Sequence, residues 1–273
     1  MSNKKMAKRK KWNNYLVVGM IMTGITLAIA IIGAFWTPYE ATAMSASEKF
    51  NGPSLLHLFG TDNFGRDIFS RVMEAVGTTV VISVLVVAAS SLVGILIGAL
   101  TGYFGGIVDE VMMRITDAIN GFPSILLALV VISVLGSGVD KLILALAIVF
   151  CPSFIRIVRS EFIKFRDADF VVRARLMGVG RMRILFVHIL PNILSTFLVS
   201  LMIGFNNAIL AESGMSFLGI GVQPPEASLG KMLSDAQGYL TSAPWYALAP
   251  GLTIVWIVLG FSLLSEGIRR QSE

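Results

Sequence analysis

The sequence predicts an all-α polytopic membrane protein with six transmembrane helices. Of its 273 residues, 55% are hydrophobic and only 14% are charged, whereas soluble domains carry about 25% charged residues. So few charges cannot cover a water-soluble surface around such an apolar chain, which excludes a soluble globular enzyme and a disordered chain. The apolar blocks also lack the strict apolar–polar alternation of membrane β-strands.

Six uncharged gaps supply the spans, because a helix that crosses a bilayer needs about 20 mostly apolar residues. In chain order, the spans are predicted at residues 15–35, 76–100, 122–135, 142–155, 192–210 and 245–264. The fourth gap is the shortest, with fourteen uncharged residues between Lys141 and Arg156. It becomes long enough if these two side chains extend to the membrane surfaces.

The distribution of basic residues predicts that both termini are cytoplasmic. With the N-terminus inside, the inner segments hold 17 Lys and Arg and the outer segments hold 5, as the positive-inside rule requires. The basic N-terminus followed by an apolar run resembles a secretory signal. However, the run 15–35 exceeds the ~7–15 apolar residues of a signal peptide, so we expect a retained anchor.

The residues that usually carry chemistry are sparse. A single cysteine, Cys151, excludes an internal disulfide, and His57 and His188 lie too far apart in sequence to suggest a metal site. No G-x-x-x-x-G-K-[ST] phosphate loop is present, because Gly230-Lys231 is followed by Met232. We therefore expect no catalytic residue, no metal and no cofactor bound by this chain, and any nucleotide energy must come from another chain.

A basic loop of about 35 residues separates the fourth and fifth predicted spans. Asp169 is a plausible N-cap and Gly178 a plausible C′ residue of a helix of about eight residues. The apolar side chains at i, i+1, i+4 and i+7 share one face: Phe170, Val171, Ala174 and Met177. So short a helix is not stable alone in water, so either the membrane surface or a cleft on a partner must cover that face.

This loop resembles the "EAA" coupling loop of the inner-membrane subunits of bacterial binding-protein-dependent ABC importers. The family pattern is E-A-A, three residues, Gly, nine residues and I-x-L-P, and the matching positions here are Val172-Arg173-Ala174, Gly178, His188, Leu190 and Pro191. Val172, Arg173 and His188 depart from the pattern, whereas the Gly and Leu-Pro spacing is kept. The resemblance implies a set of ATPase-coupling residues: Asp169, Phe170, Arg173, Ala174, Met177, Gly178, Leu190 and Pro191.

Further segments resemble, in order, the C-type permease subunit of dipeptide, oligopeptide and nickel importers. They are G-T-D-N-F-G-R-D (60–67), G-Y-F-G-G (102–106), D-x-x-x-G-F-P (117–123), S-F-L-G-I-G-V-Q-P-P (216–225) and G-K-M-L (230–233). The resemblance implies the ABC type I importer permease fold. We therefore expect five segments along the chain. They are a basic cytoplasmic tail (1–13), a first transmembrane helix (14–36), an extracytoplasmic loop (37–75), a permease domain (76–265) and a cytoplasmic tail (266–273). The coupling loop lies within the permease domain, at about 158–191.

The same resemblance implies the partners and the location. We expect a bacterial cytoplasmic membrane protein that forms a heterodimer with a second permease subunit. Two cytoplasmic ATPases that bind ATP and magnesium are expected below it, and an extracytoplasmic solute-binding protein above it. The basic tail is interpreted as a topology signal beside anionic lipid rather than as a nucleic-acid site. The cargo is expected to be a di- or oligopeptide, with nickel or a metal–chelator complex as the alternative, and an ATP-independent channel or scaffold as the alternative of another class.

Several residues within the spans have both a structural and a functional interpretation. Gly94, Gly98 and Gly102 have the four-residue spacing of close helix packing, within this subunit or with the partner permease. Asn206, Asn207 and Glu212 either line the pathway or make structural hydrogen bonds, since polar groups in a span must face protein or water. We expect Asp109, Glu110, Arg114 and Asp117 to form a solvated face or inter-helix ion pairs. Segment 216–225 is predicted to be re-entrant or interfacial, and 226–236 to be a short amphipathic helix on the outer surface.

Overall fold

The computed structural model describes residues 13–272, and apart from one bridge between Thr61 and Asp67 the described residues contain only helices and loops. Almost all of the predicted basic tail therefore lies outside the described residues. The α-helices are α1 (Asn14–Phe35), α2 (Ile68–Phe104), α3 (Gly106–Asn120), α4 (Ser124–Leu135), α5 (Val139–Arg166), α6 (Asp169–Leu176), α7 (Arg181–Arg183), α8 (Leu190–Phe217), α9 (Leu229–Ala236) and α10 (Pro244–Ser272). Two short 3-10 helices, η1 (Ala46–Glu48) and η3 (Gln237–Tyr239), and a π-helix, η2 (Ile184–Ile189), complete the set.

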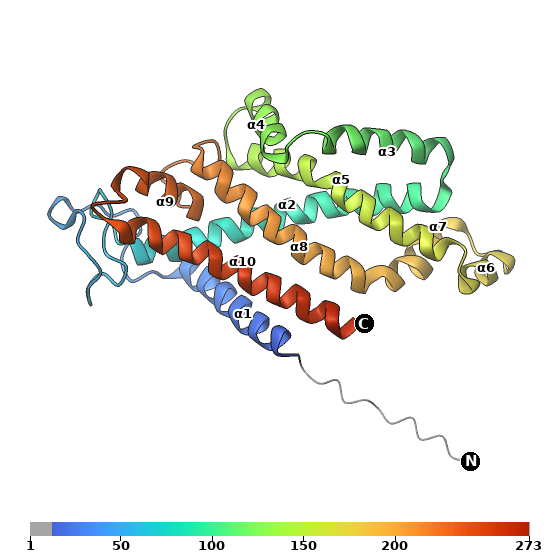
Figure 1. The fold of residues 1–273 in the computed structure, drawn as a ribbon, viewed down its shortest axis with the longest axis horizontal. Coiled ribbons are helices and arrows are strands. Elements are labelled where there is room, and N and C mark those ends of the chain that lie inside the picture. Colours follow the sequence, from blue (N-terminus) through green and yellow to red (C-terminus); the bar gives the residue numbers. More distant parts are fainter. Residues whose placement is uncertain (1–12, 273) are drawn as a thin grey trace, which may run out of the picture.

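Helix α2 runs through the centre of the bundle (Figure 1) and packs against α1, α5 and α8. Helix α10 packs against α1 and α8, and α4 lies against α5. Within residues 13–272, five helical runs are long and apolar enough to cross a membrane: α1, α2, α5, the run Arg181–Phe217 that includes α8, and α10. The bent pair α3–α4 gives a sixth span when the two helices are counted as one.

The third predicted span, residues 122–135, corresponds to α4, which is short and bent away from α3. Helices α3 and α4 meet at an angle of 94°, and α4 has 12 residues, which extend about 18 Å against a hydrocarbon core of about 30 Å. The break falls at Gly121-Phe122-Pro123. Pro123 has no N–H to donate, and it disfavours the helical conformation at Phe122.

The second helix also begins earlier than predicted, at Ile68 rather than near residue 76, so the preceding loop is shorter than 37–75. Charged Glu74 set the predicted boundary, and the helix also contains Arg71, which is buried. Its guanidinium donates to the Ala41 carbonyl at 3.2 Å and lies 3.9 Å from Asp62. Asp67 caps the helix by accepting from the Ser70 N–H at 2.8 Å. A charge can therefore enter the helix because a distant loop supplies its partners.

The end of the bundle that holds this loop also holds α9 (Figure 1). Helix α9 is short and amphipathic, as predicted. Its Leu229, Gly230 and Met232 are buried against α8, α10 and α2, and Lys231 and Asp235 are partly exposed. A Cβ atom on Gly230 would lie 2.1 Å from the Ser213 carbonyl oxygen. Helix α9 is thus fixed directly to α8.

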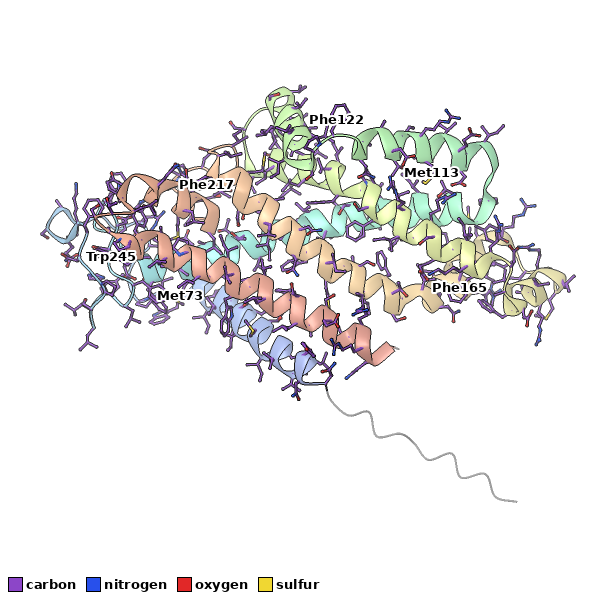
Figure 2. All side chains as sticks on the ribbon, in the orientation of Figure 1. Met73, Met113, Phe122, Phe165, Phe217 and Trp245 are labelled. Atoms are coloured by element: carbon purple, nitrogen blue, oxygen red, sulfur yellow. The ribbon has the colours of Figure 1, made fainter. Side chains whose placement is uncertain are left out.

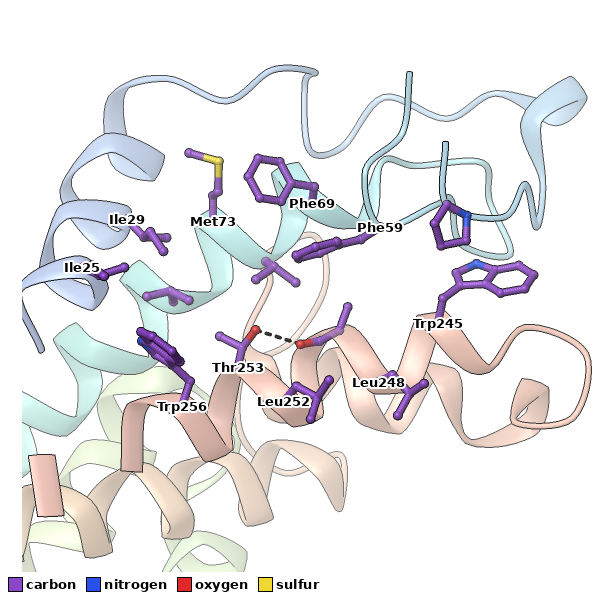
Figure 3. A pocket seen from close by; sticks show the side chains of 14 residues that line it. Ile25, Ile29, Phe59, Phe69, Met73, Trp245, Leu248, Leu252, Thr253 and Trp256 are labelled. Atoms are coloured by element: carbon purple, nitrogen blue, oxygen red, sulfur yellow. Dashed lines mark hydrogen bonds between the residues drawn. The ribbon is translucent and has the colours of Figure 1, made fainter. Parts of the chain in front are cut away.

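The outward surface is apolar. An apolar groove of 390 Å³ lies between α1, α2 and α10 near the loop end (Figure 3), and Trp245 and Trp256 are among the residues that line it. Its Thr253 hydroxyl donates to the Ala249 carbonyl at 2.7 Å within α10, so the lining presents little polar surface. Aromatic and aliphatic side chains project outward along the bundle (Figure 2), among them Phe122 and Phe217. Such a surface requires lipid or another apolar helix against it.

Candidate coupling segment and pathway face

Helix α6 begins at Asp169, one residue earlier than the capping pattern predicted. The N-cap is Ala168, whose carbonyl accepts from the N–H groups of Val171 at 2.9 Å and Val172 at 3.0 Å. Asp169 is instead the first helical residue, with no side-chain cap hydrogen bond at this terminus. In the first turn its carboxylate favours the helix through the helix dipole rather than through a cap.

The C-terminus of α6 forms a Schellman motif. Gly178 has a φ of +78°, and its N–H donates to the Arg175 carbonyl at 3.1 Å. The N–H of Val179 donates to the Ala174 carbonyl at 3.0 Å. Glycine fits this left-handed position at little cost, whereas other residues are strained there. Gly178 therefore determines the direction in which the chain leaves α6.

The predicted single apolar face of α6 is divided into two. Val171 and Ala174 point inward and are 0% and 3% exposed, whereas Met177 is 77% exposed and its neighbour Leu176 is 82% exposed. Phe170 lies between these groups and contacts Phe165 of α5, with ring centroids 6.2 Å apart. The chain itself covers one side of the helix and leaves a second apolar surface open at the end of the bundle (Figure 1).

Residues 177–180, which are not helical, join α6 to the helical run that contains α8. After α6, helix α7 leads into π-helix η2, whose Ile184, Leu185 and Ile189 are buried, and then into α8. Leu190 and Pro191 form the first turn of α8, where proline's missing N–H is not needed. Asp169 and Arg173 are exposed. A displacement of α6 is therefore passed to a helical run that extends from Arg181 to Phe217.

The three predicted packing glycines lie against α5 of the same chain. A Cβ atom would approach Phe154 at Gly94, the Ile155 carbonyl at Gly98 and the Arg159 carbonyl at Gly102, at 2.4, 2.7 and 2.7 Å respectively. No side chain fits at these separations, so glycine allows the two backbones to approach closely.

The predicted pathway residues do not share one environment. Asn206 is buried and donates to the Ser262 hydroxyl of α10 at 2.9 Å, whereas Asn207 is exposed. Glu212 is 0% exposed and accepts from Ser216 at 2.7 Å and Ser213 at 3.3 Å. An enclosed carboxylate cannot line an open pathway in this conformation, and the Glu212 position instead joins α8 to α9, whose N-cap Ser228 lies beside it.

Polar residues do recur on the outward face of α8. Asn192, Thr196, Ser200 and Asn207 follow one another at spacings of four, four and seven residues, which places them on one side of the helix. Asn192, Thr196 and Asn207 are exposed and Ser200 is partly exposed. This polar stripe lies opposite the side of α8 that holds buried Phe197 and Phe205. A membrane-spanning helix with such a stripe must turn it toward water or toward protein.

The charges on α3 form ion pairs. Asp109 pairs with Arg159 of α5, with Oδ2 2.7 Å from a guanidinium nitrogen, and Asp117 pairs with Arg156 of α5 at 2.7 Å. Glu110 pairs with Arg114 one turn away on α3 at 2.5 Å. These carboxylates hold α3 along α5, as expected for inter-helix ion pairs. Within residues 13–272, no three His, Cys, Asp or Glu side chains are grouped to hold a metal ion.

Sequence reasoning did not single out a cleft beside α6. The end of α2, the end of α5 and the α6–η2 segment enclose 480 Å³, and Arg166, Arg175 and Arg181 contribute to its wall. The sequence feature that indicates this cleft is the group of four arginines within residues 173–183, which has few acidic residues nearby.

A bundle of apolar spans, with a short helix exposed at one end and a polar stripe along one span, defines an integral membrane transport subunit. Residues 94–273 match the family of binding-protein-dependent transport system inner membrane components, and the chain belongs to this family. It is a multi-pass protein of the bacterial inner membrane and a permease of the ABC importer class.

The chain is similar to curated permeases over nearly its full length. It is 38% identical to the dipeptide transport system permease protein of Alkalihalophilus pseudofirmus, over 96% of this chain and 86% of that protein. It is 34% identical to the dipeptide transport system permease protein of Haemophilus influenzae, over 95% and 90%. It is 35% identical to the glutathione transport system permease protein of Pectobacterium atrosepticum, over 96% and 89%.

Proposed function

We propose that this chain is one of two permease subunits that together form the pathway of an ATP-driven importer of di- or oligopeptides. The names of its relatives support a peptide as the cargo. These relatives are dipeptide and glutathione transport system permeases, and glutathione is itself a small peptide. The single observation that carries the mechanism is the position of α6. It exposes Leu176 and Met177 at the end of the bundle and is joined by residues 177–180 to the helical run Arg181–Phe217, which contains α8.

In the proposed orientation, α6 and both termini lie in the cytoplasm. The ratio of 17 to 5 basic residues supports it. The start of α1, the end of α10 and α6 also lie toward the same end of the bundle, opposite α9 (Figure 1). Two cytoplasmic ATPases, which hold ATP and magnesium, then cover the open side of α6. An extracytoplasmic solute-binding protein docks at the end that holds α9.

The coupling step is a rigid movement between two arrangements of the bundle. When the ATPases close on ATP, they displace α6 through Leu176, Met177 and the exposed Asp169 and Arg173. The displacement moves α8, because the helical run from Arg181 to Phe217 is continuous. The polar stripe on α8 faces the second permease subunit and forms one wall of the pathway. Coupling is reciprocal, so docking of the binding protein outside alters nucleotide affinity inside.

The test uses Gly178→Pro in the reconstituted complex of both permeases, both ATPases and the binding protein. Proline requires a φ near −65° and cannot adopt the +78° of Gly178, so the end of α6 is disrupted. We expect dipeptide uptake and peptide-stimulated ATPase activity to fall together by at least about tenfold, which corresponds to ~1.4 kcal/mol.

Gly180→Pro is the matched control. Gly180 has a φ of −62°, which suits proline, so this variant should transport at the wild-type rate. Wild-type uptake and ATPase stimulation in Gly178→Pro would overturn the coupling role. Uptake without ATP would favour a channel, and failure of the ATPases to co-purify would favour a scaffold. Calorimetry of the binding protein with dipeptides, Ni²⁺ and a nickel chelate then decides between the peptide and metal cargoes.

A further inference from the structure

The cleft beside α6 contains more positive charge than the coupling role requires. Eight basic residues lie between Arg156 and Arg183. Four of them pair with carboxylates: Arg156 with Asp117, Arg159 with Asp109, Lys164 with Glu161, and Arg166 with Asp167. The other four have no carboxylate partner within residues 13–272: Arg173, Arg175, Arg181 and Arg183. Two of these, Arg175 and Arg181, line the cleft.

Aromatic rings orient both cleft arginines. The guanidinium carbon of Arg175 lies 5.8 Å from the ring centroid of Tyr103, and that of Arg181 lies 5.9 Å from the ring centroid of Phe104. A cation–π contact of this kind uses the face of the guanidinium group. The N–H groups project in the plane of the group, so they stay available for an oxyanion. Arg175 uses one of them on the Arg166 carbonyl at 3.4 Å.

The remaining charges leave the cleft cationic. Arg166 lies 3.3 Å from Asp167, the one carboxylate of the lining. Three guanidinium groups against one carboxylate surround a space of 480 Å³. Arginine forks of this kind match the oxygens of a phosphate group.

The surroundings identify the source of the phosphate as a lipid. Phe104 is 44% exposed, and Ile107 and Val108, just beyond the turn, are 81% and 61% exposed. Apolar side chains so exposed beside the arginines place the cleft where the hydrocarbon region meets the headgroups. A free phosphate ion would contact only the arginines. A phospholipid contacts the arginines with its headgroup and the apolar side chains with its acyl chains.

We propose that the cleft formed by Arg166, Arg175 and Arg181 between the ends of α2 and α5 and the α6–η2 segment binds the phosphate of an anionic phospholipid headgroup. The lipid then joins the end of α2 to the coupling segment from the side opposite the exposed Leu176 and Met177. Its acyl chains lie along Phe104 and Ile107. Bound lipid makes the position of α6 sensitive to the composition of the membrane.

The test measures lipid retention by native mass spectrometry of the full chain in detergent, with dioleoylphosphatidylglycerol as the probe. We expect the wild type to retain this lipid. Arg175→Gln and Arg181→Gln should each lower the affinity about fivefold, since an arginine near an anionic surface contributes about 1 kcal/mol. Arg175→Lys keeps the charge but loses the planar fork, and should give an intermediate loss.

Arg183→Gln is the matched control, because Arg183 is exposed, lies two residues from Arg181 and does not line the cleft. It should retain the lipid as the wild type does. Equal losses in all three Gln variants, or no loss in any, would overturn the site. Displacement of the lipid by millimolar inorganic phosphate would overturn the lipid as occupant. Thermal unfolding midpoints confirm that each variant is folded, and the binding measurement requires no transport, so it is independent of the peptide-import proposal.

Discussion

At the residue scale, the contact between α2 and α5 depends on the absence of side chains. Gly94, Gly98 and Gly102 place the α2 backbone directly on the α5 backbone. A Cβ atom on Gly98 would lie 2.7 Å from the Ile155 carbonyl oxygen and 2.8 Å from the Val158 Cβ. In a membrane, where apolar side chains gain little from leaving lipid, such close packing is a main source of helix association.

We predict that Gly98→Leu destabilises the protein by about 1–3 kcal/mol, because the added side chain forces α2 and α5 apart. The measurement is the thermal unfolding midpoint in detergent. Gly24→Leu is the control, since a Cβ atom at Gly24 of α1 meets nothing within 4 Å. Equal midpoints for the two variants would contradict the packing role.

Sequence could place the glycines on one face but could not identify their partner helix. The same limit applies to the partners of Arg71 and Glu212. A hydropathy scale assigns each charged residue, taken alone, an unfavourable free energy of membrane insertion. In the folded chain, hydrogen-bond and ion-pair partners from distant parts of the sequence offset this free energy. Arg71 contacts Ala41 and Asp62, and Glu212 accepts hydrogen bonds from serines beside α9. Such pairings depend on tertiary structure and leave no local signal.

At the element scale, the apolar composition of the sequence predicted the long helices. It did not predict the break between α3 and α4 or which side of α6 is buried. The spans now seen as α1, α2, α8 and α10 follow from the absence of charge over about 20 residues, whereas α5 was predicted from only fourteen uncharged residues between Lys141 and Arg156. The bend between α3 and α4 depends on Pro123 and the preceding two residues, inside an otherwise apolar stretch. The inward side of α6 was unpredictable, because η2 and α5 cover Val171 and Ala174 only once the chain has folded.

The polar stripe on α8 gives a prediction at this scale. Asn207→Leu should lower peptide uptake by about fivefold, because it removes a polar contact of about 1 kcal/mol from the pathway wall. Uptake is measured with the reconstituted complex. Leu210→Ile, three residues further along the same exposed face, alters shape without altering polarity and should transport normally. Equal uptake by both variants would place the stripe outside the pathway.

At the scale of the whole molecule, the two ends of the bundle differ in character. One end holds α6 and the basic segment, and the other holds α9 and a loop with a buried polar network (Figure 1). In that network, Asp62 pairs with Arg66 at 2.6 Å and His57 lies 2.9 Å from Asp67. The proposed topology places these ends on opposite sides of the membrane.

Labelling with a membrane-impermeant maleimide tests this topology in a Cys151→Ala background, which removes the only cysteine of the chain. Leu55→Cys, at a position 98% exposed in the outer loop, should label in intact spheroplasts. Met177→Cys, at a position 77% exposed on the coupling segment, should label only in inverted vesicles, prepared from cells that lack the ATPases because these are proposed to cover Met177. The reverse pattern would invert the orientation.

The close packing of Gly230 against Ser213 has a consequence for how α8 and α9 move. Gly230 of α9 packs against Ser213 near one end of α8, and η2 is continuous with the other end, so one helical run links Arg181 to the contact with α9. In the proposed mechanism, a movement at one end of this run also displaces the other end. The two mouths of the proposed pathway would then be linked by geometry, so that opening on one side entails a change on the other and a continuous leak is avoided.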